Sequence, residues 1–189
     1  MKSPLFALAL AALAAPASAD SFVPAMEKFL QSSVKSWSAD PVLLDALRDQ
    51  NATSVSYSQS EIDALDKAWR AEVGTGSSPT IDPVIGNAAA DFLRARVSAS
   101  AGQITEIILM DATGLNAAVS HVTSDMWQGD EAKYTETYPM GPTGVHYSEI
   151  EKDESTGRYQ AQISFSITDP ATGDVIGAMT VGVDAESLL

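Results

Sequence analysis

The first half of the chain has the hydrophobic spacing of helices. Apolar residues recur at three- and four-residue steps from Phe22 to Trp37, which places them along one side of a helix. Three further apolar faces follow before Gly102, and the loop GTGSSP at residues 74–79 precedes the last of them. We therefore predict a helical region over residues 20–102. Its helix-start signals are Asp40-Pro41, Ser58 with Glu61, and Asp82-Pro83.

From residue 103 the pattern changes to that of strands separated by turns. Five apolar or alternating runs are joined by turn sequences such as DATG and DPATGD, which favour antiparallel hairpins. The long connection at residues 120–144, which we call the lid segment, contains a predicted helix from Asp130 to about Thr137 and then a loop. The predicted strands are residues 104–110, 116–120, 145–151, 158–168 and 175–183, and the tight turns are residues 111–114, 153–157 and 169–174.

The fourth predicted strand shows which side of the sheet is buried. Successive side chains of a strand point to opposite faces, so its alternating apolar positions should meet the N-terminal helices. Its polar positions should then face solvent or a cavity under the lid segment. Five antiparallel strands packed on helices give an α+β fold. The apolar positions are Tyr159, Ala161, Ile163, Phe165 and Ile167, and the polar positions are Gln160, Gln162, Ser164 and Ser166.

The start of the chain has the features of an export signal. Lys2 is followed by an apolar run from Leu5 to Ala15 and by the small residues Ala17-Ser18-Ala19. The run is shorter than the roughly 20 residues that span a bilayer as a helix. We expect cleavage after Ala19, a periplasmic location, and a mature chain that is not inserted in the membrane. The predicted divisions are residues 1–19 (signal peptide), 20–102 (helical region), 103–184 (sheet domain) and 185–189 (C-terminal tail).

Composition and motifs exclude several classes of function. The chain has no cysteine, so it has no disulfide, thiol nucleophile or cysteine-ligated zinc. Its formal net charge of −14 opposes binding to nucleic acid or anionic lipid. It contains no phosphate-binding loop, serine-nucleophile elbow or zinc-protease motif, and its acidic stretches lack the spacing of a calcium loop. We therefore expect a protein that is not an enzyme and needs no cofactor or metal.

Two stretches of the sheet domain resemble the Cache superfamily of extracellular sensor domains, also called PDC-type domains, which are relatives of PAS domains. They are ILMDATGLNAAVSHVTSDMWQGDEA, which matches strand, turn, short strand and variable loop, and ISFSITDPATGDVIGAMTVGVD, which matches the closing hairpin. The resemblance covers about residues 103–184. It implies a PAS-like five-stranded sheet with a long N-terminal helix behind it, and a small molecule bound on the face away from that helix.

The resemblance also implies a role in signal transduction. Domains of this type usually lie between two transmembrane helices of a chemoreceptor, histidine kinase or cyclase. No second apolar segment long enough to span a membrane follows residue 184 here. We therefore expect a free-standing, single-Cache exported protein that binds a small ligand and acts through a membrane-bound receptor or kinase.

The candidate ligand site combines polar strand positions with the lid segment. Beyond residue 100 the only cationic side chains are Lys133, Lys152 and Arg158, so a multiply charged anion would be poorly neutralised. A neutral, zwitterionic or cationic ligand fits better. Each candidate also has a structural explanation, such as loop packing for Trp127. The candidate ligand-binding residues are Ser120, His121, Trp127, Lys133, Tyr134, Tyr138, His146, Gln162 and Ser164.

Two other functions remain open from the sequence. In the first, the protein is an interaction module without a small ligand, in which Trp127 and Tyr138 fill the pocket and the helical surface of residues 40–75 contacts a partner. In the second and weaker one, it is a metal-dependent hydrolase. The two histidines of the chain are 25 positions apart (146 − 121), so they could share a metal only if the fold brought them together.

Overall fold

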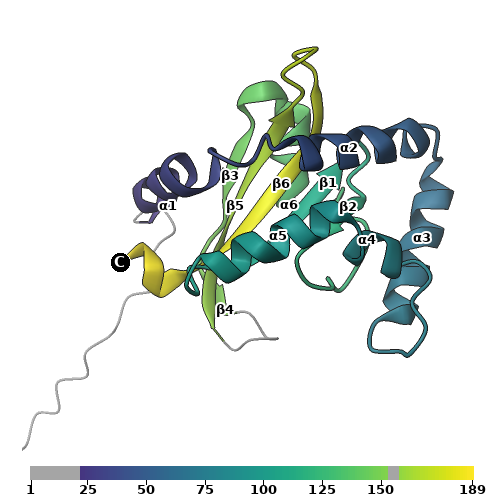
Figure 1. The fold of residues 1–189 in the computed structure, drawn as a ribbon, viewed down its shortest axis with the longest axis horizontal. Helices are drawn as coiled ribbons and strands as arrows, with labels where there is room; N and C mark the ends of the chain where they lie inside the picture. The colour runs from purple at the N-terminus through teal and green to yellow at the C-terminus, as the bar shows by residue number, and fades with distance from the viewer. Residues whose placement is uncertain (1–21, 153–157) are drawn as a thin grey trace, which may run out of the picture.

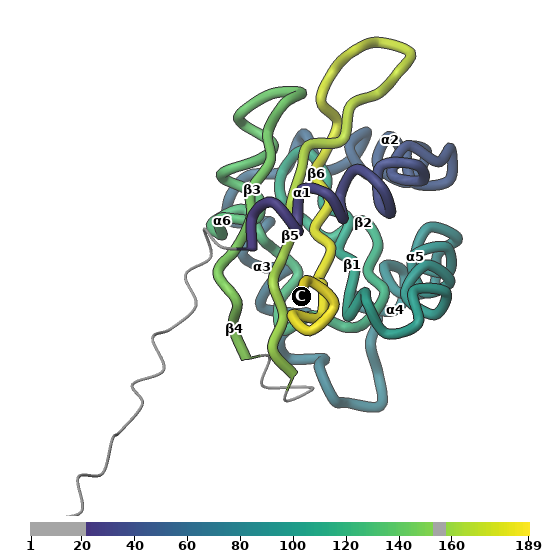
Figure 2. The backbone as a smooth tube through the Cα atoms, turned by 90° about the vertical axis from the view of Figure 1, so that its left-hand side faces the viewer, coloured from purple at the N-terminus to yellow at the C-terminus, as the bar shows by residue number. Residues whose placement is uncertain are grey.

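The computed structural model describes residues 22–152 and 158–189. The predicted signal peptide at residues 1–19 and the predicted turn at residues 153–157 lie outside the described residues. The described chain forms one antiparallel sheet, with helices over one face and with the lid segment and the helix at residues 59–72 over the other (Figure 1, Figure 2). This arrangement confirms the predicted α+β fold with a PAS-like sheet.

The strands of the sheet follow the order β2-β1-β6-β5-β3, and β4 pairs with β5. The adjacent inner strands β1 and β6 are far apart in the sequence, whereas β5 and β6 form a local hairpin. All the pairings are antiparallel. The strands are β1 (Ile104–Asp111), β2 (Asn116–Val119), β3 (Val145–Tyr147), β4 (Glu151–Lys152), β5 (Tyr159–Thr168) and β6 (Val175–Asp184).

The predicted strand at residues 145–151 is divided into β3 and β4 by a local irregularity at Ser148. The Ser148 backbone N–H donates to the Gln162 carbonyl at 2.9 Å, and its hydroxyl accepts from the Gln162 backbone N–H at 2.8 Å. A side chain thus takes the place of a backbone carbonyl in the ladder. The regular pairing stops there and resumes at Glu151, opposite Gln160.

The N-terminal half is helical, as predicted, but the helix expected after Asp82 is divided in two. The Asn87 side chain accepts from the Ala90 backbone N–H at 2.8 Å and so begins a new helix directly after Gly86. No helix in the described part of the chain is both long and apolar enough to cross a membrane. The helices are α1 (Val23–Phe29), the π-helical η2 (Leu30–Val34), α2 (Pro41–Ser54), α3 (Gln59–Glu72), α4 (Asp82–Ile85) and α5 (Ala88–Ala99).

The first face of the sheet packs against α1, η2, α2 and α5 in one hydrophobic core (Figure 1). Met26, Leu30 and Val34 lie one helical turn apart along the predicted stripe, and all three are buried. The apolar positions of β5 are buried against them, with one exception. Tyr159 is 60% exposed, because it pairs with Lys152 of β4, at the end of the sheet beyond the helices.

The second face is half apolar and half polar. Near β2, apolar side chains of β1 and β6 pack with Ile62 and Trp69 of α3 and with Met126 of the lid segment in a second core. Towards β3 the same face carries the polar positions of β5. Figure 2 shows α2 and α5 on one side of the sheet and α6 towards the other. The candidate ligand site must therefore be sought on the polar half.

The lid segment contains less helix than predicted. Its helix α6 covers only Ala132–Thr135, and Glu131 rather than Asp130 is the residue before the first turn. The expected loop that follows is the 3-10 helix η3 (Tyr138–Thr143), which is kinked at Gly141. A second 3-10 helix, η4 (Ala185–Leu188), follows β6.

Candidate functional site

The polar half of the second face is built by strand register. Residues directly opposite each other in antiparallel strands point to the same face. Ser164 of β5 lies opposite both Thr180 of β6 and His146 of β3. One step along the strands, Gly182 of β6 lies between Glu106 of β1 and Gln162 of β5. We call this surface the polar face; it consists of Glu106, His146, Gln160, Gln162, Ser164 and Thr180.

A pair of hydroxyl groups lies at the centre of the polar face. Ser164 and Thr180 are both fully buried, and their hydroxyl oxygens are 2.9 Å apart. In such a pair one hydroxyl donates and the other accepts, so the pair keeps further hydrogen-bonding capacity. The next residue on β1 in this row is the buried Ile108. The hydroxyl pair therefore marks the boundary between the apolar and the polar half of the face.

Glu106 is the charged group of the polar face. Its carboxylate is half-buried and accepts from the side-chain amides of Gln162 at 3.2 Å and Gln160 at 3.4 Å. Thr105 donates its hydroxyl to the Gln160 amide oxygen at 2.7 Å and so orients that amide group towards the carboxylate. Among the described residues, no lysine, arginine or histidine lies within ion-pair distance of Glu106.

Gly182 leaves room for this arrangement. A Cβ atom at position 182 would lie 2.4 Å from the Thr105 hydroxyl and 2.8 Å from the Glu106 Cγ. The side chains of Thr105 and Glu106 thus occupy the space that any other residue at position 182 would fill. The glycine allows the carboxylate to lie over the sheet, where the amide groups of β5 reach it.

The lid segment covers the other end of the polar face with two stacked tyrosines. The rings of Tyr134 and Tyr138 are 5.3 Å apart with planes inclined by 13°, and the Tyr134 hydroxyl donates to the Ala112 carbonyl at 2.7 Å. Burial, with a smaller contribution from Asp111, raises the pKa of both phenols, so both are neutral at physiological pH. The Ser166 hydroxyl donates to the Thr137 carbonyl at 2.9 Å and joins the lid segment to β5.

Lys133 and Trp127 take part in interactions within the lid segment. The Lys133 ammonium lies 3.1 Å from the Gln128 amide oxygen and 3.0 Å from the Glu131 carboxylate, and its side chain is only 12% exposed. The Trp127 ring donates its N–H to the Thr113 carbonyl at 2.9 Å and packs on Gly129. Trp127 thus has the loop-packing role considered above, and Lys133 forms an ion pair and a hydrogen bond within the lid segment.

Ser120 and His121 lie at the opposite edge of the sheet from His146. The Ser120 hydroxyl is buried and accepts from the Ile107 backbone N–H at 2.8 Å, while His121 is exposed. They follow β2, and four strand spacings separate β2 from β3, which is about 19 Å. The structure therefore brings together His146, Gln162 and Ser164, with Tyr134 and Tyr138 at the lid end, but places Ser120 and His121 apart from them.

Sequence reasoning missed Glu106, Gln160 and Thr180 as site residues. The signal for Glu106 was present, because it is the one charged residue within the apolar run of residues 104–110. It lies two positions from Ile108, so the two side chains point to the same face of the strand. Thr180 carried no such signal, since its position opposite Ser164 depends on hairpin register. Within the described chain, no three histidine or acidic side chains are grouped as metal ligands.

The chain is similar in structure to the sensor domain of a histidine kinase and to the ligand-binding domain of a chemoreceptor. The histidine kinase DctB sensor domain of V. cholerae matches with a TM-score of 0.43 and 14% identity over 89% of this chain and 54% of that chain. The ligand-binding domain of the Campylobacter jejuni chemoreceptor Tlp3, solved with 4-methylisoleucine, matches with a TM-score of 0.42 and 15% identity over 85% of this chain and 64% of that chain.

These similarities are low, and this chain spans only about half to two thirds of the structures it matches. They carry no argument about ligand or partner. No known family model and no curated protein matches the sequence. The resemblance to Cache-type sensor domains therefore rests on the sequence motifs and on the strand order of the sheet.

Proposed function

We propose that this protein is an exported, sensor-type domain that binds a small molecule carrying an ammonium group on the polar face. The observation that supports this most directly is the Glu106 carboxylate. It is half-buried, it is oriented by two amide groups, and no cationic side chain of the described residues pairs with it. A carboxylate in such surroundings binds an ammonium group by a charge-assisted hydrogen bond.

The rest of the polar face can hold the uncharged part of the ligand. Gln162 and Ser164 are two residues apart on β5, so their side chains project about 7 Å from each other on the same face. A cationic or zwitterionic molecule of amino-acid size spans this distance. Its ammonium group would lie at Glu106, and its other polar groups would contact Gln162 and His146, which are both half-buried. His146 would limit the site on the side of β3.

We further propose that the bound form acts on a membrane-bound receptor or kinase and catalyses no reaction. The lid segment is the part that would transmit binding, because it covers the polar face and forms part of the molecular surface at Met140, which is 58% exposed. A ligand that contacts both β5 and the lid segment would favour one position of the lid. The shape offered to a partner would change with it.

Calorimetric titration with amines, amino acids, uncharged amides and carboxylic acids tests this function. We expect amines or amino acids to bind the purified chain and Glu106→Gln to weaken that binding at least about tenfold, since it removes the charge and keeps the shape. Glu27→Gln, which removes the same charge from an exposed position of α1 on the other side of the sheet, should leave the affinity unchanged.

Three results would overturn the proposal. Equal weakening by both variants would mean that only the overall negative charge attracts the ligand. Binding of uncharged amides or carboxylic acids with no binding of amines would show that the polar face serves another chemistry. If no compound bound, the interaction module without a small ligand would become the better explanation.

A further inference from the structure

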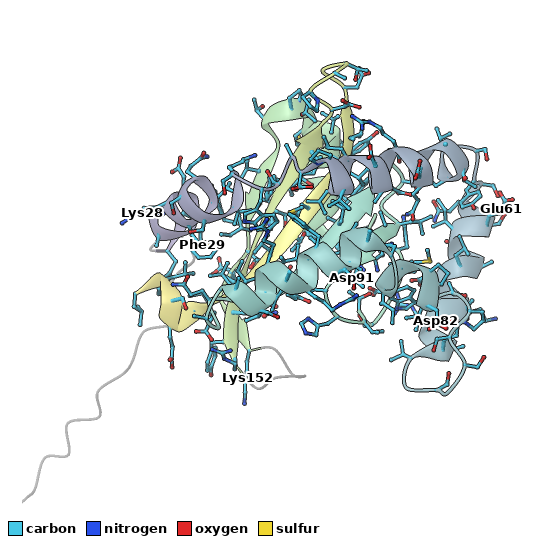
Figure 3. The ribbon with its side chains drawn as sticks, viewed as in Figure 1. Lys28, Phe29, Glu61, Asp82, Asp91 and Lys152 are labelled. Atoms are coloured by element: carbon cyan, nitrogen blue, oxygen red, sulfur yellow. The ribbon has the colours of Figure 1, made fainter. Side chains whose placement is uncertain are left out.

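A cavity lies away from the polar face, between helices α2, α3 and α4. It has a volume of about 400 Å³, which is within the usual range for sites of small ligands. Figure 3 locates its helical walls, since Glu61 marks the start of α3 and Asp82 marks α4. The residues that matter most for its chemistry are Ser54, Tyr57, Leu65, Val84, Leu115 and Met126.

The lining of this cavity carries no acidic or basic side chain. The Glu72 carboxylate lies beside the lining residue Thr80 and is already hydrogen-bonded. It accepts from the Thr80 hydroxyl at 2.7 Å and from the backbone N–H groups of Thr80 and Ile81 at 2.8 and 3.1 Å. Burial acts against the charged form, but these hydrogen bonds keep the pKa of Glu72 below its usual value. A charged ligand would therefore have no counter-charge inside the cavity.

One polar group of the lining lacks a partner. Ser54, in the last turn of α2, is only 1% exposed, and its hydroxyl has no hydrogen-bond partner among the described residues. Buried hydroxyl groups in proteins are nearly always hydrogen-bonded. Because Ser54 lines the cavity, a molecule in the cavity can supply the missing hydrogen bond.

The cavity also contacts the base of the lid segment. Leu115 pairs with Trp127 across an isolated bridge, and the Met126 carbonyl accepts from the Asn116 backbone N–H at 2.9 Å. Gln50, another lining residue, donates its side-chain N–H to the Asp111 carboxylate at 2.9 Å. A molecule in the cavity would thus contact the residues that hold the start of the lid segment, while remaining separate from Glu106.

We propose that this cavity binds an uncharged, mostly apolar small molecule with one hydroxyl or carbonyl group, which hydrogen-bonds to the Ser54 hydroxyl. Small aromatic or alicyclic alcohols and ketones have this chemistry. The apolar part packs between Leu65, Val84 and Met126, and the polar group lies at the end of α2. The site is independent of the amine site on the polar face.

Benzyl alcohol, benzylamine and benzoate form a matched set of probes for this site, because they share a ring and differ in charge. We expect benzyl alcohol to shift the methyl NMR signals of Leu65, Val84 and Met126 in a saturable way, and benzoate to leave them unshifted. Ser54→Ala should weaken benzyl alcohol binding about fivefold, the effect of one hydrogen bond. Ser56→Ala, at an exposed serine outside the lining, should not.

Two further variants keep the test decisive. Leu65→Phe fills the cavity from its half-buried wall and should abolish binding even if Ser54→Ala proves unstable. Glu106→Gln should weaken benzylamine binding on the polar face but leave benzyl alcohol binding intact, so failure of one site is distinguishable from failure of the other. Unshifted methyl signals with benzyl alcohol, or equal affinity in the parent and in Ser54→Ala, would overturn the proposal.

Discussion

At the scale of single residues, two glycines determine how Trp127 packs. A Cβ atom at Gly129 would lie 2.3 Å from the Trp127 ring nitrogen, and Gly114, with φ of +84°, lies against the Gly129 backbone. The ring can donate to the Thr113 carbonyl only because both positions lack side chains. The tryptophan that was considered as a ligand contact is fixed in position by its neighbours.

Gly129→Ala should therefore destabilise the protein. The added methyl group forces the Trp127 ring away from Thr113, and such overpacking reduces the free energy of unfolding by about 1–3 kcal/mol. Urea denaturation measures the change. Gly76→Ala is the control, because its added Cβ would meet nothing within 4 Å. Equal stabilities of the two variants would show that the loop adjusts without strain.

At the scale of elements, α3 holds the lid segment through one carboxylate. Asp66 accepts from the backbone N–H groups of Met126 and Trp127 at 2.9 and 3.1 Å and from the Arg70 side chain at 2.7 Å. Burial raises the pKa of Asp66, but the hydrogen bonds from Arg70, Trp127 and Met126 outweigh it, so the pKa lies below its usual value. Arg70 also reaches Asp125 at 3.2 Å.

The lowered pKa predicts a dependence of stability on pH. Because the carboxylate is favoured in the folded state, its contribution is present above the unfolded pKa of about 4 and is lost as pH falls through the folded pKa. Asp66→Asn should lower the free energy of unfolding by about 1 kcal/mol at pH 7, and the difference from the parent should shrink in acid.

Chemical denaturation between pH 7 and pH 3 tests this prediction. Asp63→Asn on the same helix, at an exposed position, should change stability much less. A difference between the parent and Asp66→Asn that stays constant over this range would mean that the Asp66 charge is unimportant for the lid segment.

Whether a segment forms a helix or a strand was predictable from the sequence. The breaks within these elements and the residues that they contact in the fold were not. The hairpin turns and the helix starts depend on local residues, and the Ser58–Glu61 capping box forms as expected. The break at Ser148 depends on a hydrogen bond to another strand, so no local pattern reveals it. The same limit applies to the candidate site, because Gln162 and Ser164 were visible as an alternating set whereas Thr180 joins them only through register.

At the scale of the whole molecule, two cores on opposite faces stabilise one sheet. The larger core contains the fully buried Phe165, and the ammonium group of Lys35 lies 4.2 Å from the centre of its ring. Burial lowers the pKa of Lys35. The predicted helical region and the sheet domain share this core, so the helices and the sheet depend on each other for stability.

Phe165→Ala should have a large effect for this reason. Removing a buried phenylalanine from a core reduces the free energy of unfolding by about 3–5 kcal/mol, a large part of the 5–15 kcal/mol that is typical of a domain. Thermal unfolding followed by circular dichroism measures the loss. Tyr159→Ala, in the same strand but 60% exposed, should lower the melting temperature only slightly. Similar losses for both variants would contradict the assignment of the core to the helix-covered face.

The central position of the β1–β6 pair has a consequence for the rate at which the chain folds. Leu109 lies opposite Met179, so this pairing must close a loop of 70 positions (179 − 109), whereas β5 and β6 are joined by the short turn at residues 169–174. Local hairpins close quickly, and long loops carry a larger entropic barrier. We expect the β5–β6 hairpin to form early and β1 to join it late. Weakening the hairpin would then slow refolding, while weakening β1 would mainly speed unfolding.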